Sequence, residues 1–363
     1  MRDGRLGFGI MGCGEVAVVH RGAIEACDEA ELVAVCDVDQ QRTHEFARSD
    51  TGIRAYRDYE DLVRDPRVDV VCVCTPPGLH ADGVIAAAQA SKHALCEKPL
   101  EVTRERMTQM ISACRKAGVK LGCVFQYRTR PEMIEIRRAI RLGNLGPLLI
   151  GDAYLKKYRS RAYYEGAAWR RTWGFDGGGV LMNQAIHGMD LLLWLLGDEV
   201  QSVFARGDHK VRDIEGLDTV VACVAYRSGA YGVIEATTSC NPGEPERLEL
   251  HGTNGTICVK GWRVSRWATT RDENVRAQDG DPGLTAAQTG AAGLIGRDHA
   301  GLLQDMVRAV KEDRDPYITG ESARRAVDLA LAIQESIRSG RDVRLEAPEP
   351  AETGLALPAA ASG

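Results

Sequence analysis

The segment LGFGIMGCGEVAVVH, residues 6–20, is the stretch of the sequence that best indicates the fold. An apolar run of the kind that forms a buried strand leads directly into Gly12 and Gly14, and an amphipathic segment containing Ala17 follows. Gly12 allows a tight turn, Gly14 lets the backbone approach a pyrophosphate, and Ala17 lets the helix pack closely on the sheet. A G-x-G-x-x-A pattern at a strand-to-helix turn therefore predicts a dinucleotide-binding unit.

The next apolar run supplies the acid that this unit needs. ELVAVCD ends in Asp37, about 20 residues after Gly14, where the motif places the group that binds the adenosine ribose. A carboxylate there accepts hydrogen bonds from the ribose hydroxyls and repels a 2′-phosphate, so it favours NAD over NADP. We expect Glu15, Val16 and Val38 to line the same site. A glycine-rich turn without a ligand, or an S-adenosylmethionine site, stays open as an alternative on these residues alone.

The first 125 residues alternate between short apolar runs and amphipathic segments. Runs rich in Val and Cys predict buried strands within residues 6–12, 31–37, 68–75, 93–99 and 120–126. The segments between them predict helices at about residues 15–27, 40–48, 81–90 and 104–117. Strands and helices alternating in this way predict a parallel sheet with right-handed crossovers.

The pattern changes after about residue 145. Strand-like segments follow one another through short turns such as RSG and GTNG, and they predict a mostly antiparallel sheet with a helix at 180–196 on one face. From about residue 297 the chain returns to helix. We therefore predict an α/β Rossmann-type dinucleotide-binding domain, residues 1–125, and an α+β domain with an open, mostly antiparallel sheet for substrate binding and oligomerisation, residues 126–345. The C-terminal helices can pack back on the first domain, and residues 346–363 predict a flexible tail.

Composition excludes several other classes of protein. The 363 residues carry a net charge of -5, without the basic surplus of a nucleic-acid-binding protein. No apolar run reaches the ~18 residues that span a bilayer, and the N-terminus enters a strand without a signal peptide. The 11 cysteines form no Cys-x-x-Cys pair, so we expect reduced, buried thiols such as Cys36, Cys72, Cys74 and Cys123, and no metal. A cytoplasmic protein without nucleic-acid or membrane partners is expected.

A second segment, GGGVLMNQAIHGMDLLLWLLG at residues 177–197, places polar groups on an apolar helix. Asn183, His187 and Asp190 are spaced by four and three residues, which puts them on one helical face. A single histidine on an apolar helix is usually a buried, hydrogen-bonded core residue. The nearby amide and the three preceding glycines favour the alternative, in which this face is the wall of an active site.

Together with CTPPGLHA (74–81) and CEKPL (96–100), these segments resemble the glucose-fructose oxidoreductase / inositol dehydrogenase / rhizopine-catabolism protein family from residue 5 to about residue 345. The resemblance implies a dinucleotide-binding domain followed by an open α+β domain. It implies that the cofactor is bordered by Thr75, Pro76, His80, Glu97 and Lys98. The segment Glu97-Lys98-Pro99 corresponds to the family's Glu-Lys-Pro motif, whose lysine points at the substrate hydroxyl and whose Lys-Pro bond is often cis.

The resemblance also assigns the catalytic groups. His187 corresponds to the family's catalytic histidine, which accepts the proton of an alcohol, while Lys98 stabilises the carbinol oxygen and keeps the histidine neutral. Asn183 stands where many members carry aspartate, and an amide cannot accept a proton. We therefore expect Asn183 to hydrogen-bond the substrate or the imidazole. Asp190 either orients His187 or is structural, and the structural role is favoured.

An aromatic and basic segment, residues 154–179, precedes the catalytic helix. Aromatic faces stack on sugar C–H surfaces and arginines donate to hydroxyls, which fits the sugars and cyclitols that the family uses. We expect Arg128, Tyr158, Arg170 and Trp173, with Asn183 and His187, to contact the substrate. The same residue types also fill cores and interfaces, and the arginines fit an anionic substrate such as a sugar acid or a nucleotide sugar equally well.

The sequence therefore predicts an NAD-dependent dehydrogenase of a sugar, cyclitol or sugar derivative, acting as a homodimer or homotetramer. Two alternatives stay open. One is a redox-assisted glycosidase of the same fold that retains its NAD. The other is a non-catalytic dinucleotide-binding sensor, which the presence of both Lys98 and His187 disfavours.

Overall fold

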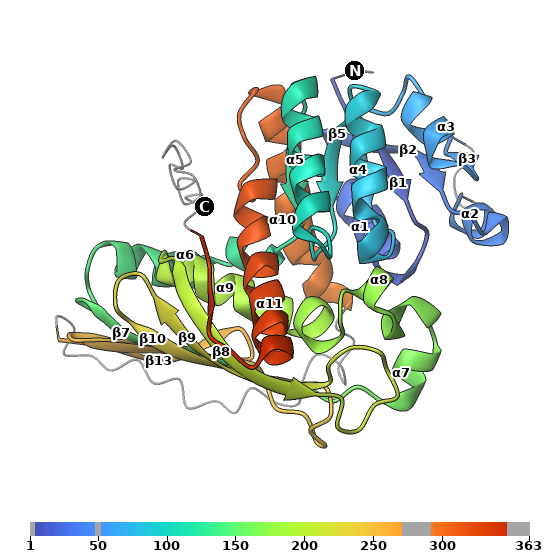
Figure 1. Ribbon diagram of the computed structural model, residues 1–363. Helices are drawn as coiled ribbons and strands as arrows, with labels where there is room; N and C mark the ends of the chain where they lie inside the picture. The colour runs from blue at the N-terminus through green and yellow to red at the C-terminus, as the bar shows by residue number, and fades with distance from the viewer. Residues whose placement is uncertain (1–3, 48–51, 271–291, 347–363) are drawn as a thin grey trace.

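The computed structural model describes residues 4–47, 52–270 and 292–346, with the side chains of residues 292–297 excepted. Its first part is a six-stranded parallel sheet in the order β3-β2-β1-β4-β5-β6, with helices on both faces (Figure 1). This strand order is the one that places a dinucleotide across the point where the chain reverses direction along the sheet. The strands are β1 (Leu6–Met11), β2 (Ala30–Cys36), β3 (Arg54–Tyr56), β4 (Val70–Val73), β5 (His93–Cys96) and β6 (Leu121–Cys123).

The predicted elements of this sheet are confirmed to within a few residues. The helices are α1 (Glu15–Glu25), α2 (Gln40–Ala47), α4 (His80–Gln89) and α5 (Arg104–Ala117). The prediction missed β3 and the helix after it, α3 (Tyr59–Arg64), because this edge strand has three residues, none buried, and so lacks an apolar run. The four cysteines named above are buried and unpaired, and burial raises the pKa of Cys36 to about 12.

The second part is an eight-stranded sheet in the order β13-β12-β11-β7-β10-β9-β8-β14, in which the β7–β10 pair is parallel and the other pairs are antiparallel. The predicted mostly antiparallel sheet is thus confirmed. Strands β13 and β14 were missed because the first has a single buried residue, Thr269, and the second has two residues in all. The strands are β7 (Leu148–Lys156), β8 (Val200–Asp208), β9 (Thr219–Tyr226), β10 (Tyr231–Thr237), β11 (Arg247–Gly252), β12 (Gly255–Lys260), β13 (Arg263–Thr269) and β14 (Val343–Arg344).

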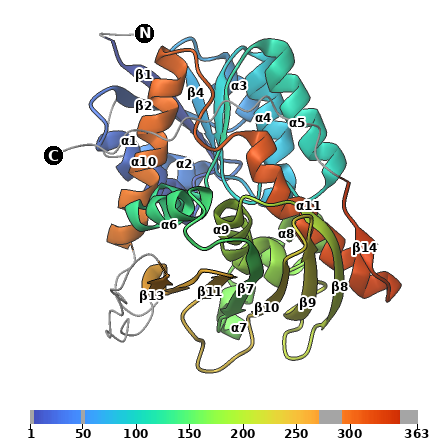
Figure 2. The same cartoon turned by 90° about the vertical axis from the view of Figure 1, so that its left-hand side faces the viewer.

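The predicted helix at 180–196 lies between the two sheets and has two parts. Val180–Ala185 form a π-helix, and α9 (Ile186–Leu196) continues it to Gly197, whose positive φ ends the helix. Every residue of α9 except His187 is buried, because the helix packs on β7 and on helices from both sides (Figure 2). This burial fixes the polar face of the helix at the boundary between the two sheets.

Several helices complete the structure. The segment between β6 and α9 contains η2 (Gln126–Thr129), α6 (Pro131–Arg141), α7 (Arg161–Glu165), η3 (Ala168–Arg171) and α8 (Trp173–Asp176), and η1 (Pro77–Leu79) precedes α4. The two C-terminal helices are α10 (Ala292–Lys311), which packs on α1, and α11 (Gly320–Ser339), which lies along β8 and α9. The C-terminal part of the chain therefore contacts both sheets. The predicted flexible tail lies, apart from Glu346, outside the described residues.

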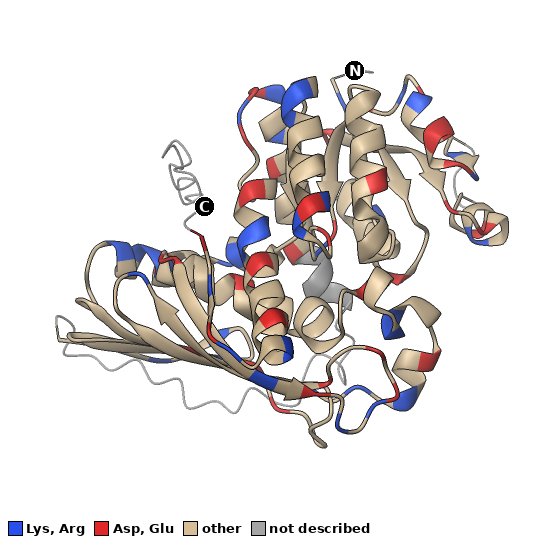
Figure 3. Ribbon diagram, viewed as in Figure 1, with Lys and Arg blue, Asp and Glu red and all other residues tan. Residues whose placement is uncertain are grey.

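The surface agrees with the bulk composition. Lys and Arg are interspersed with Asp and Glu over the face that Figure 3 shows, without a basic stripe. Among the described helices none combines the length and the apolar character needed to cross a membrane. The outer face of the second sheet carries the exposed apolar side chains of Leu149, Phe204, Val221 and Tyr231. Such a face suits the predicted homo-oligomer, which stays a prediction.

Candidate active site

The glycine turn after β1 has the geometry that the sequence predicts. Gly12 has a φ of +96°, and a Cβ there would lie 2.8 Å from the carbonyl oxygen of Cys74, so only glycine fits this turn. A Cβ on Gly14 would meet no atom within 4 Å, which leaves open space at the start of α1. Asp37 stands beside the turn, and its Oδ2 accepts a hydrogen bond of 2.8 Å from the backbone N–H of Cys13.

The residues around this turn fit a bound dinucleotide. The first N–H groups of α1, from Glu15 onward, face the open space and suit a pyrophosphate. The hydroxyl of Thr75, at the end of β4, is buried and has no hydrogen-bond partner among the described residues. An unpaired buried hydroxyl at a cofactor-binding edge is the kind of group that a ligand satisfies. Val38 is largely exposed next to Asp37, where an adenosine could cover it.

His80, which the resemblance places beside the cofactor, contacts two backbone carbonyls of its own chain. Its side chain is fully buried, and its two ring nitrogens lie 2.8 Å from the carbonyl oxygen of Pro99 and 2.9 Å from that of Thr75. Burial lowers the pKa of His80, and the two carbonyls, which accept hydrogen bonds from the ring, oppose that shift. The ring joins the Thr75 turn to the cis Lys98–Pro99 bond, and a ligand would have to displace a backbone contact to reach it.

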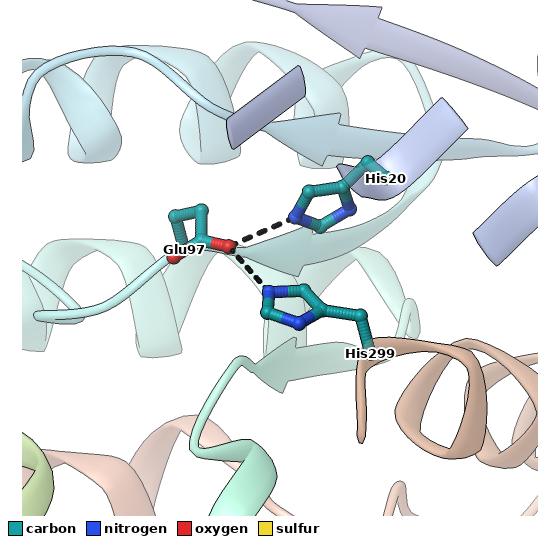
Figure 4. Close-up of side chains that lie close together, drawn as sticks. All are labelled: His20, Glu97 and His299. Atoms are coloured by element: carbon teal, nitrogen blue, oxygen red, sulfur yellow. Dashed lines mark hydrogen bonds and ion pairs between the residues drawn. The ribbon is translucent and has the colours of Figure 1, made fainter. Parts of the chain in front are cut away.

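Glu97 is the centre of a buried cluster that the sequence did not reveal (Figure 4). Its Oε1 lies 2.9 Å from Nε2 of His20 on α1 and 3.3 Å from Nε2 of His299 on α10, and its Oε2 accepts the N–H of Lys98. The three ligand-type atoms lie within 4.8 Å of one another. Burial raises the pKa of Glu97, but the hydrogen bonds and charges of the two imidazoles outweigh it and hold that pKa well below its usual range. The carboxylate joins α1, β5 and α10 directly below Lys98.

Lys98 follows β5 and reaches across to the second domain. Its bond to Pro99 is cis, and its Nζ donates a hydrogen bond of 3.2 Å to the backbone carbonyl of Asn183 in the π-helix. Burial lowers the pKa of Lys98, and the carboxylate of Glu97 opposes that shift. The edge where Lys98 stands, beyond the carboxyl ends of β4 and β5, is the edge at which ligands of doubly wound sheets bind.

His187 occupies the first turn of α9 among aromatic rings. Tyr127 and Phe125 contact the imidazole edge-on, with ring centroids 5.2 and 6.1 Å away. Its Nδ1 is buried and has no hydrogen-bond partner within the described chain. Burial, followed by the charges of Lys98 and Lys157, holds the pKa of His187 well below its usual value. The direction of this shift favours the predicted neutral imidazole, and burial contributes more to it than the lysine charge.

Asn183 contacts an acid that the sequence analysis did not single out. Its Nδ2 donates a hydrogen bond of 2.6 Å to Oδ1 of Asp176, the last residue of α8, and Gly179 donates its N–H to Oδ2 of the same carboxyl over 3.0 Å. Burial raises the pKa of Asp176 to about 7, while Lys98 and Arg170 oppose that shift. The signal that could have found Asp176 is its position, immediately before the three glycines that lead into the helix carrying Asn183 and His187.

Arg128, which the sequence predicts to contact substrate, forms a buried ion pair with Asp190. The guanidinium donates from Nε to Asp190 Oδ2 over 2.8 Å, and it also bonds the other oxygen of Asp190 and the side chain of Ser322. Both charged side chains are nearly inaccessible to solvent. A buried pair of this kind has little capacity left for a ligand. The expected structural role of Asp190 is therefore the one observed, and no hydrogen bond joins it to His187 among the described residues.

The remaining substrate candidates lie on the segment before the glycines. The Cζ of Arg170 lies 4.3 Å from the ring centroid of Tyr163, and its guanidinium pairs with Glu15 of α1. Arg170 therefore connects the segment before the glycines to the first part of the structure. Trp173 and Tyr158 are 43% and 39% exposed and are available to a ligand. Sequence reasoning missed two further cations. Lys157, paired with Glu246, and Arg159 both act on the pKa of Lys98.

The site combines a glycine turn that has room for a pyrophosphate with an acid suited to the ribose. It also has a histidine beside a buried lysine. These features are those of an NAD-binding oxidoreductase. Two family models match the chain, "Oxidoreductase family, NAD-binding Rossmann fold" over residues 6–125 and "GFO/IDH/MocA C-terminal domain" over residues 133–258. The chain belongs to the Gfo/Idh/MocA family of oxidoreductases. The predicted fold, family and cofactor are thereby confirmed.

The relatives include enzymes of known name. Myo-inositol 2-dehydrogenase of Thermotoga maritima is 29% identical over 346 residues, 93% of this chain and 98% of the relative. The scyllo-inositol 2-dehydrogenase (NAD(+)) of Bacillus subtilis is 25% identical over 366 residues, 95% of this chain and 98% of the relative. The structure of the WlbA dehydrogenase from Bordetella pertussis, in complex with NADH and UDP-GlcNAcA, matches with a TM-score of 0.83 and 30% identity over 95% of this chain and 100% of that one.

Proposed function

We propose that this protein is an NAD-dependent dehydrogenase that oxidises one hydroxyl of a sugar, a cyclitol or a sugar derivative. The observation that carries the proposal is the proximity of His187 to Lys98. A neutral imidazole with an unpaired nitrogen lies close enough to a buried lysine for the lysine charge to lower its pKa. Both groups stand at the sheet edge beside the cofactor residues, and together they can remove an alcohol proton and stabilise the oxygen that loses it.

Each group has one task in the reaction. NAD, when bound, accepts the hydride that leaves the carbinol carbon. His187 accepts the hydroxyl proton, because its low pKa keeps the ring neutral before the reaction. Lys98 donates a hydrogen bond to the same oxygen and stabilises its developing negative charge. Asn183, held in one orientation by Asp176, hydrogen-bonds the substrate.

The proposed substrate class follows from the groups around these two residues. Trp173 and Tyr158 are partly exposed aromatic side chains, which can stack on sugar C–H surfaces. The names of the relatives support cyclitols and a nucleotide sugar acid. Lys157 and Arg159 act on Lys98, and Arg170 acts on Asp176, so cations stand near both groups. They suit substrates with a carboxylate or phosphate as well as neutral polyols.

The experiment is a spectrophotometric assay of reduced nicotinamide with purified protein and either NAD or NADP. The panel contains inositols, hexoses, pentoses, anhydrosugars, sugar acids, nucleotide sugars and glycosides. We expect absorbance at the reduced nicotinamide band to rise with NAD and one of these classes. The same panel with the Lys98→Met variant shows whether the rise belongs to this site.

The other outcomes lead to the alternatives. Consumption of a glycoside without net NADH would contradict the dehydrogenase and support a redox-assisted glycosidase with retained NAD. Binding of NAD without turnover of any compound, together with an unchanged biological role in Lys98 and His187 variants, would support a sensor.

A further inference from the structure

A chain of hydrogen bonds runs beside the catalytic lysine from Arg159 to the backbone of Gly179. Arg159 donates from Nε and Nη2 to Oε1 of Gln184 over 3.0 and 2.7 Å. Gln184 donates from Nε2 to Oδ1 of Asn183 over 3.0 Å, and Asn183 donates from Nδ2 to Oδ1 of Asp176 over 2.6 Å. The N–H of Gly179 donates to Oδ2 of Asp176 over 3.0 Å. Two amides and one carboxyl therefore connect the two ends.

Both ends of this chain are donors that cannot accept, because a guanidinium and a backbone N–H have no lone pair to offer. An amide side chain accepts a hydrogen bond on one side and donates one on the other, so the donor-to-acceptor direction is the same on both sides of it. A chain between two donors therefore needs one member that accepts on both sides, and an ionised carboxyl is such a group. Asp176 is that member, and an amide in its place would leave two N–H groups facing each other in every arrangement.

We propose that Asp176 is a positioning residue for the dehydrogenase reaction, which orients the Asn183 amide and places a negative charge beside Lys98. The proposal rests on the proposed function, since it acts through Lys98 and Asn183. The side chain of Asp176 is 2% exposed, so solvent cannot take over its two hydrogen bonds. Lys98 donates to the backbone carbonyl of Asn183, which links the lysine to the same chain. The acid that many family members carry at position 183 is thus supplied here from position 176.

The charges around Asp176 set the pH range of this role. Lys98 from the loop after β5 and Arg170 from η3 act on its carboxyl, and Lys98 is itself surrounded by Glu97, Lys157 and Arg159. Burial raises the pKa of Asp176 to about 7. Protonation below that pH turns one of its acceptors into a donor and removes the counter-charge of Lys98. Turnover should therefore fall as the pH drops through about 7.

Three variants separate the two parts of the role. Asp176→Asn removes the double acceptor. Asp176→Asn combined with Asn183→Asp restores one double acceptor and keeps a carboxylate near Lys98. Asp176→Asn combined with Gln184→Glu is the matched control, because it also restores one double acceptor but moves the charge next to Arg159. Melting temperature and NADH binding identify any variant that fails to fold.

Two readouts are used on each variant: the pH profile of kcat with the substrate found above, and the titration of Lys98 by NMR of protein labelled with [ε-¹³C]lysine, with Lys98→Met to assign the signal. We expect kcat to fall at least about tenfold in Asp176→Asn, with loss of the decline near pH 7 and a lower pKa of Lys98. The exchange with Asn183→Asp should recover most of the turnover and the Lys98 titration. The Gln184→Glu control should recover melting temperature, but not the Lys98 titration.

Wild-type turnover and an unchanged pH profile in folded Asp176→Asn would overturn the proposal, and so would equal recovery of the Lys98 titration by both double variants. If wild type oxidises no compound of the panel, the proposed function fails. The Lys98 titration then still tests whether Asp176 places its charge beside Lys98, because that measurement needs no substrate.

Discussion

Two polar clusters lie at the carboxyl edge of the first sheet. The Glu97 cluster contains Glu97, His20 and His299, and the Lys98 cluster contains Lys98 and His187. They differ in how many of their polar atoms have hydrogen-bond partners. In the Glu97 cluster the carboxylate bonds His20, His299 and a backbone N–H, and all three side chains are buried. In the Lys98 cluster, one nitrogen of His187 has no partner among the described residues. A fully bonded cluster fixes backbone positions, whereas an unpaired group beside a charge is available to react. The carboxylate of Glu97 is thus bonded within the protein, whereas the chemical role of its neighbour Lys98 is the one that we propose.

The largest expected effect on turnover comes from removing the positive charge of Lys98. Lys98→Met keeps the length of the side chain but loses the cationic donor, so kcat should fall about 10³-fold or more while NAD still binds. Steady-state kinetics and NADH fluorescence measure the two quantities, and the exposed Lys116→Met provides a control on loss of a lysine elsewhere. Loss of NAD binding, or unchanged turnover, would show that Lys98 does not have the assigned role.

Replacing the proton acceptor should have the next largest effect. His187→Asn keeps a polar side chain but cannot accept the proton, and kcat should fall about 10²-fold or more with little change in NAD affinity. Because the pKa of His187 is well below its usual value, wild-type turnover should show no decline that belongs to this residue between pH 6 and 8. A pH profile of kcat that rises around 6.5 and loses that rise in His187→Asn would contradict the neutral assignment.

Substitutions in the Glu97 cluster should change the free energy of unfolding rather than the catalytic rate. His20→Leu leaves one oxygen of Glu97 with a missing partner and should lower the free energy of unfolding by about 1–3 kcal/mol, measured by denaturant titration. His20→Gln is the matched variant, since its amide N–H can still donate to the carboxylate. Equal losses in both variants would mean that ring packing, not the hydrogen bond, stabilises the cluster.

The same cluster has a predictable response to acid. The folded pKa of Glu97 is held below its unfolded value, so its stabilising contribution is complete above about pH 4.5 and is lost as the pH falls below it. The stability difference between wild type and Glu97→Gln should therefore shrink on acidification, when measured at several pH values by denaturant titration. A constant difference down to pH 3 would contradict an ionised, bonded Glu97.

The smallest expected effect concerns cofactor choice, at a distance from both clusters. Asp37→Ala removes the carboxylate that repels a 2′-phosphate, so the ratio of kcat/KM for NAD over NADP should fall about tenfold. Asp39→Ala, on the same loop but bonded to the N-terminus of α2, should change the ratio less. If the ratio in Asp37→Ala equals that of wild type, cofactor choice depends on other residues.

The predictions from sequence succeeded where a local pattern has one physical solution. The buried strands of the first sheet, the turn at Gly12 and the helix that carries His187 follow from apolar periodicity and from glycine conformations that other residues cannot adopt. Local pattern failed for β3 and β14, which are too short to carry a pattern. It also did not reveal the protein partners of His80 and Arg128, because the packing of distant segments decides which groups a polar side chain bonds.

The sequence by itself determined the class of this protein, because the glycine turn, Asp37, the Glu97-Lys98-Pro99 segment and the polar face of α9 are each contained in a short stretch. Only the tertiary structure decided which of these groups are left to react. Glu97 is occupied by His20 and His299, which come from opposite ends of the chain, and Asn183 is oriented by Asp176 across a turn of three glycines. Hydrogen-bond partners and burial arise from the packing of distant segments, and no local pattern encodes them.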